Sequence, residues 1–68
     1  MEALLLRDVN PIYREVYLDA LDKQGLRVYS KDQNLDGWIR AIDIFLVYDN
    51  PSELELAKKT ISDLNVNL

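Results

Sequence analysis

The sequence predicts an α+β fold in which an antiparallel sheet carries two helices on one face. Asn-Pro occurs twice, at Asn10-Pro11 and at Asn50-Pro51, and an asparagine N-cap followed by proline is typical of a helix start. An apolar stretch precedes each Asn-Pro, and a segment of alternating apolar and polar residues follows each expected helix. Together these observations predict the order strand, helix, strand, repeated twice within a single domain, 1–68.

The apolar pattern of the strands predicts their places in the sheet. We expect strands near 2–8, 26–31 and 39–48, with 66–68 as a marginal edge strand. The runs LLL and IFLVY are apolar on both faces, as central strands are, whereas LRVYSK and VNL alternate, as edge strands do. A ferredoxin-like βαββα(β) fold has its first and third strands in the centre and its second and fourth strands at the edges. The sequence therefore predicts this architecture.

The two helices are expected near 11–24 and 51–64. The first has a broad apolar arc, which suits packing on a sheet and on a neighbouring helix. Gly25 and Asn65 follow the two helices and tolerate the left-handed conformation of a helix C-cap. The second helix is amphipathic, and its apolar residues recur on one face: Leu54, Ala57, Ile61 and Leu64.

Composition argues against several functions. The chain has 68 residues, a net charge of −4, no cysteine and no histidine. Its basic residues form no stripe, so we expect no nucleic-acid partner. No apolar run approaches the ~20 residues that span a bilayer, and MEALLLRD lacks the basic start of a secretory signal, so we expect no membrane association and a cytoplasmic location. Without histidine, cysteine or a glycine-rich phosphate loop, we expect no enzyme and, apart from the calcium alternative below, no cofactor.

Two longer segments carry a family resemblance. LDKQGLRVYS has the pattern helix, glycine, strand, and FLVYDNPSELELAKKTISDL has the pattern strand, acidic turn, helix. With the opening strand and a glycine-containing hairpin, the chain resembles a family of small prokaryotic signal-transducing proteins with a ferredoxin-like fold. The hairpin here is shorter than that family's. Amino-acid-binding regulatory domains of the ACT type share the topology but favour glycine in the first strand–helix turn, where this chain has DVNP. Either resemblance implies a sensing or interaction module and no reaction.

The stretch DQNLDGWIRAID, residues 32–43, matches the spacing of an EF-hand calcium loop. Asp32, Asn34, Asp36 and Asp43 fall at ligand positions, and Gly37 falls at the tight turn. Calcium prefers six to eight oxygen ligands, which closely spaced carboxylates and amides supply.

Three observations favour a β-hairpin instead. The closing acid is aspartate rather than the longer glutamate, a second complete loop is missing, and Gly25 interrupts the helix that should lead into the loop. Asp, Asn and Gly are also the residues that any turn prefers. We therefore expect a hairpin and keep a calcium loop as the alternative.

The predicted sheet leaves one face without helices. If Leu4, Leu6, Val28, Ile42, Ile44 and Leu46 point toward the helices, period-2 alternation places on the open face Leu5, Tyr29, Phe45 and Val47. Such a cluster on a small protein is typical of an interface. We therefore expect a small non-enzymatic regulatory or protein-interaction module that binds a protein partner or itself, as a homodimer, through this face. The alternatives are a calcium-binding module using 32–43 and a small acidic inhibitor of a target with a basic site.

Overall fold

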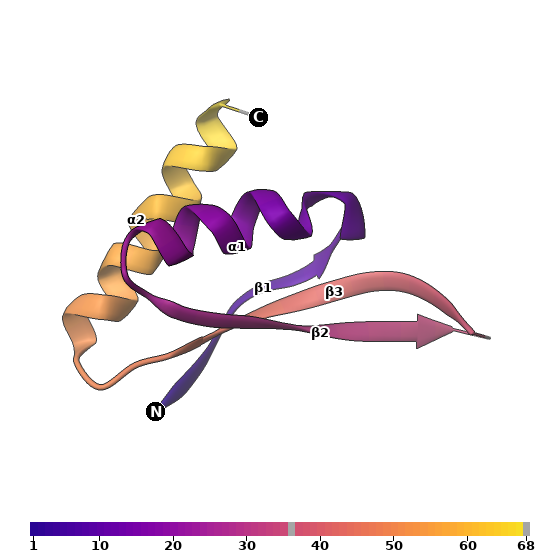
Figure 1. Cartoon of the computed structure of the whole chain (residues 1–68), viewed down its shortest axis with the longest axis horizontal. Coiled ribbons are helices and arrows are strands. Elements are labelled where there is room, and N and C mark those ends of the chain that lie inside the picture. The colour runs from indigo at the N-terminus through magenta and orange to yellow at the C-terminus, as the bar shows by residue number, and fades with distance from the viewer. Residues whose placement is uncertain (36, 68) are drawn as a thin grey trace.

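The computed structural model describes residues 1–35 and 37–67, with the side chains of Leu35 and Asn67 excepted. The elements follow one another in the order shown in Figure 1: β1 (Glu2–Val9), the 3-10 helix η1 (Pro11–Tyr13), α1 (Arg14–Lys23), β2 (Arg27–Leu35), β3 (Trp38–Val47) and α2 (Pro51–Asn67). Within these ranges, no helix combines the length and the apolar character that a membrane crossing requires.

The strands form one antiparallel sheet in the order β1-β3-β2. The expected α+β fold, with an antiparallel sheet and two helices, is confirmed to this extent. The prediction of an edge strand at 66–68 is wrong, because α2 continues through Asn67; Leu68 lies outside the described residues. Asn65 is held within the helix rather than at its end, since its Oδ1 accepts a hydrogen bond of 2.6 Å from the Tyr17 hydroxyl of α1.

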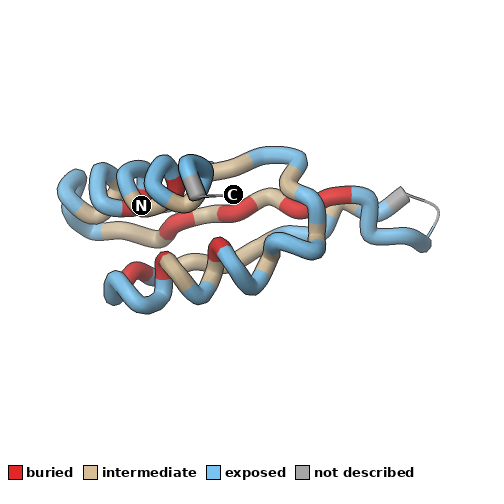
Figure 2. Tube along the Cα trace, turned by 90° about the horizontal axis from the view of Figure 1, so that it is seen from above, coloured by how far each residue is buried: buried red, intermediate tan, exposed pale blue. Residues whose placement is uncertain are grey.

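Both helices pack on the same face of the sheet. Alternate residues of β3 are fully buried on this face, namely Ile42, Ile44 and Leu46, as period-2 alternation requires. Figure 2 shows α2 on the β1 side and α1 on the β2 side, with the buried residues of β3 between them. The helices complete the core with Tyr17, Leu21, Ala57 and Ile61, and Leu26 joins it from the turn before β2.

The predicted asparagine cap is seen at Asn10, and a different cap is seen at the start of α2. The Asn10 side chain accepts a hydrogen bond of 3.1 Å from the Ile12 N–H at the start of η1. At the start of α2, the Glu53 carboxylate accepts hydrogen bonds from the N–H groups of Asp49 and Asn50, each of 3.3 Å. This backward bond from the third helical residue is the second half of a capping box.

Strand β1 is irregular. Its pairing with β3 runs from Leu4 opposite Phe45 to Leu6 opposite Ile44, so Leu5 is an extra residue in the ladder. A second shift separates Leu6 from Val9, and within it Asp8 has a φ of +58°. A bulge of this kind changes the face on which the following side chains lie.

Candidate functional site

The open face of the sheet, opposite the helices, carries one row of large apolar side chains. Leu4 of β1 lies opposite Phe45 of β3, which lies opposite Tyr29 of β2, so the three side chains share this face. The rings of Tyr29 and Phe45 stack with centroids 5.3 Å apart and an interplanar angle of 15°. Leu4 is 41% exposed, and the two rings are half-buried. We call these three residues the Phe45 row.

Two charged side chains frame the Phe45 row. The Lys31 ammonium lies 5.4 Å from the centroid of the Phe45 ring, within the range of a cation–π interaction. The Tyr29 hydroxyl donates a hydrogen bond to the Glu2 carboxylate, which links β2 to β1 across the central strand. This hydrogen bond, followed by desolvation and by the negative charge of Glu2, raises the pKa of Tyr29 above 10.0. The row is therefore apolar at its centre and polar at its margin.

Three of the four residues predicted for the open face lie on that face. Tyr29 and Phe45 lie on the open face, and Val47 shares that face through its pairing with Glu2 and Arg27. Leu5 does not: it is half-buried and packs against the core beneath the helices. The predicted phase of β1 is wrong at this point, because the bulge at Leu5 sets Leu5 and Leu6 against the core and leaves Leu4 on the open face.

A polar cluster lies beside the row on the same face. The Gln33 side-chain amide donates hydrogen bonds of 2.8 Å to the carboxylates of both Asp8 and Asp43. The Asp8 N–H donates a further bond of 3.1 Å to Asp43. The cluster therefore joins all three strands and fixes the left-handed backbone at Asp8. Nothing in the sequence marks Asp8, Gln33 and Asp43 as neighbours, because the contact depends on the register of β1.

The segment 32–43 is a hairpin in the described residues, as we expect from the sequence. Asn34 pairs with Ile39 and Leu35 with Trp38, while Gly37 has a φ of +85°. Asp32 lies opposite Ile42, on the helix side, and forms an ion pair with Arg14. Asp43 lies on the open face.

The hairpin separates the predicted calcium ligands instead of gathering them. Asp32 and Asp43 project from opposite faces of the sheet, and Asn34 is further along β2. Asp36 lies outside the described residues. Among those that are described, no three His, Cys, Asp or Glu residues are grouped as metal ligands.

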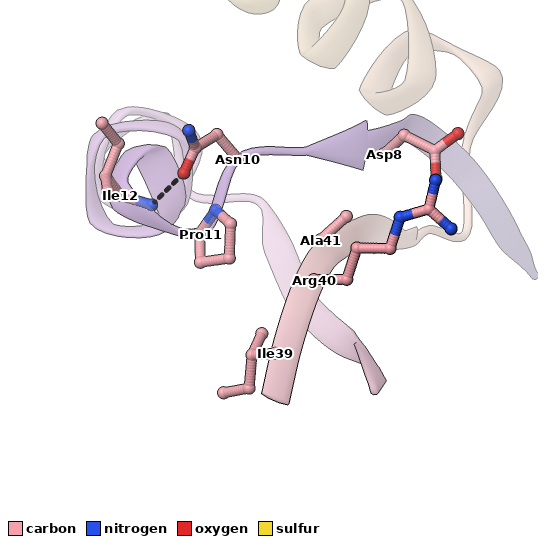
Figure 3. Close-up of a pocket in the computed structure, with 7 residues that line it drawn as sticks. All are labelled: Asp8, Asn10, Pro11, Ile12, Ile39, Arg40 and Ala41. Atoms are coloured by element: carbon pink, nitrogen blue, oxygen red, sulfur yellow. Dashed lines mark hydrogen bonds between the residues drawn. The ribbon is translucent and has the colours of Figure 1, made fainter. Parts of the chain in front are cut away.

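A hollow lies at the C-terminal end of β1. It has a volume of about 600 Å³ and is bounded by the end of β1, by η1 and by the start of β3. Pro11, Ile12 and Ile39 form its apolar wall, and Figure 3 shows Arg40 extended toward Asp8 at its rim. Asp8 and Arg40 are its only charged lining residues, and neither is a nucleophile with a base beside it. The hollow therefore offers an apolar wall with one acidic and one basic side chain at its rim.

No family model, curated protein or solved structure matches the chain.

Proposed function

We propose that the protein is a small non-enzymatic interaction module that acts through the open face of a ferredoxin-like sheet. The observation that carries this proposal is the Phe45 row, an apolar strip that crosses all three strands on the face without helices. The strip has the composition of a binding surface, with aromatic rings in the centre and charged groups, Glu2 and Lys31, at its margin.

The strand order β1-β3-β2 supports the ferredoxin-like assignment. The middle strand of this sheet is the third in sequence, and both helices cover one face, as in the βαββα portion of that fold. The fourth strand of the complete fold would lie beside β1. The sequence resembles a signal-transducing family with this fold. We therefore include in the proposal that the protein is a regulatory module.

The substitution Phe45→Asp tests the proposal. Burying a phenylalanine side chain contributes about 1.5–3 kcal/mol to a contact, and Phe45 is already half-buried in the monomer, so we expect binding to weaken by about tenfold or more. The variant should remain folded, because the substituted side chain lies on the open face. Sedimentation velocity measures self-association, and co-purification from the source organism measures retention of a partner.

Two further variants serve as controls. Ser62→Asp adds the same charge on the exposed side of α2 and should leave binding unchanged. Ile44→Asp places a carboxylate in the fully buried core and should unfold the domain, which circular dichroism detects. If Phe45→Asp and Ser62→Asp bind equally well, the open face is not the interaction surface.

A further inference from the structure

The outer edge of β1 has no partner strand among residues 1–35 and 37–67. β1 pairs with β3 on its inner side, and the segment that the sequence predicts as a strand near 66–68 belongs instead to α2 as far as Asn67. An unpaired strand edge presents a row of N–H and C=O groups to which another strand can pair.

The pairing of the first residue shows which groups face outward. Met1 and Tyr48 exchange two backbone hydrogen bonds, the Met1 amino group to the Tyr48 carbonyl at 2.9 Å and the Tyr48 N–H to the Met1 carbonyl at 2.8 Å. Hydrogen-bonded and non-hydrogen-bonded pairs alternate along an antiparallel ladder. Ala3 therefore directs its N–H and C=O toward β3, whereas Glu2 and Leu4 direct theirs toward the free edge.

The free edge from Glu2 to Leu4, before the bulge at Leu5, is open to strand pairing. It contains no proline and no lysine, and its interior is apolar. Further along, the bulge at Leu5 and the left-handed Asp8 interrupt the strand. The part of β1 that can accept a new strand is therefore short and centred on Leu4.

We propose that this edge pairs with the same edge of a second copy of the chain, antiparallel, about a two-fold axis at Leu4. In this register the outward N–H of each Leu4 donates a hydrogen bond to the outward C=O of the other Leu4. Both Leu4 side chains lie on the open face, so the two Phe45 rows join into one strip across a six-stranded sheet.

The flanking residues suit the same register. Ala3 comes opposite Leu5 of the second copy, and both lie on the side covered by helices. Because the bulge sets Leu5 and Leu6 of the second copy together opposite Ala3, Glu2 comes opposite the second copy's Arg7, so two pairs of opposite charges face each other across the edge. These agreements favour a second copy over an unrelated strand as the occupant. The inference concerns the edge of the sheet and does not depend on the function proposed for its open face.

The edge that pairs is short, so we expect a weak dimer that dissociates on dilution. Amide hydrogen exchange of the purified, isotope-labelled protein tests the pairing directly. The Ala3 N–H should be protected at every concentration, because it bonds within the monomer. The Leu4 N–H should exchange freely in dilute solution and become protected as the dimer forms. A Leu4 N–H that stays unprotected at millimolar concentration, or a chain that sediments as a monomer there, overturns the proposal.

Substitutions separate edge pairing from contact through the open face. Leu4→Pro removes an outward N–H that the monomer does not use and should raise the dimer dissociation constant by about tenfold or more. Leu4→Ala trims the side chain but keeps the N–H, so protection at position 4 should persist in the dimer. If Phe45→Asp abolishes the dimer while the Leu4 N–H is never protected in the wild type, the copies associate through the open face and the edge proposal fails alone. If circular dichroism shows that Leu4→Pro is unfolded, the hydrogen exchange of the Leu4 N–H in the wild-type protein tests the edge pairing instead.

Discussion

At the scale of single residues, Tyr29 is the side chain that ties the open face together. Its ring covers Phe45 on the central strand, and its hydroxyl reaches Glu2 on the far strand. The Phe45 row and the hydrogen bond to Glu2 thus both depend on the Tyr29 side chain. The sequence predicts Tyr29 on this face from alternation alone, but the bond to Glu2 depends on the stagger of two strands that are not adjacent in the sheet.

The bond between Tyr29 and Glu2 makes stability depend on pH. Because the pKa of Tyr29 is raised in the folded state, the stabilisation from the neutral phenol is complete below pH 10.0 and is lost as the pH rises through the raised pKa. We expect Tyr29→Phe to remove a tyrosine whose pKa is raised above 10.0, and to reduce the fall in unfolding free energy above pH 10.0. Ultraviolet titration of tyrosinate and urea denaturation measure the two effects.

Glu2→Gln provides the control for this prediction. It keeps an acceptor for the Tyr29 hydroxyl but removes the negative charge, so the pKa of Tyr29 should move back toward its ordinary value. If the titration of the Tyr29→Phe protein shows that the lost tyrosine had an ordinary pKa, the raised pKa of Tyr29 is contradicted.

At the scale of elements, the end of α1 follows directly from the sequence. Gly25 has a φ of +78° and its N–H bonds to the Asp22 carbonyl at 2.9 Å, while the Leu26 N–H bonds to the Leu21 carbonyl at 3.3 Å. This pair of bonds is a Schellman motif, and its apolar contact is made by Leu21 and Leu26, both buried in the core. The glycine that the sequence marks as a C-cap therefore also directs the chain into β2.

Gly25→Ala should destabilise the protein by about 1 kcal/mol, because an L-residue in the left-handed region is strained. A Cβ at this position would meet no atom within 4 Å, so the cost is conformational rather than steric. Gln24→Ala, one residue earlier and exposed, should change stability little. Urea denaturation compares the two variants. Equal stabilities for Gly25→Ala and the wild type would show that an L-residue is not strained at position 25.

The elements also show where sequence reasoning succeeds and where it fails. In β2 and β3 the alternation is regular over the core, and the predicted faces of Val28, Ile44 and Phe45 are confirmed. In β1 the bulge at Leu5 shifts the phase, and an extra residue in a ladder has no signature in the run LLL. At the end of α2, the tertiary bond from Tyr17 overrides the local preference of asparagine for a helix end.

At the scale of the whole molecule, the core is one layer of side chains between a sheet and two helices. Its fully buried large residues are few: Leu21, Ile42, Ile44 and Leu46. A chain of 68 residues draws only about 3–5 kcal/mol of net stability from a core of this size. Each buried side chain of β3 is therefore a large part of the total.

Ile42→Ala should leave the protein largely unfolded, since removing a buried isoleucine costs about 2–5 kcal/mol. Ile39→Ala on the same strand is the matched control, because Ile39 is 47% exposed and should cost less than about 1 kcal/mol. Circular dichroism during urea titration measures both. Similar losses of unfolding free energy for the two variants would show that Ile39 and Ile42 do not differ in burial as the structure indicates.

The central place of β3 also sets the order in which the sheet assembles. Leu35 pairs with Trp38 across a tight turn, whereas Glu2 pairs with Val47 across most of the chain. Closing the short loop costs less conformational entropy, so the β2–β3 hairpin forms early and β1 is added late. During translation, however, β1 leaves the ribosome before β2 and β3. Its apolar run therefore waits without a partner until β3 has emerged, and in this interval the nascent chain is most exposed to aggregation and to chaperones.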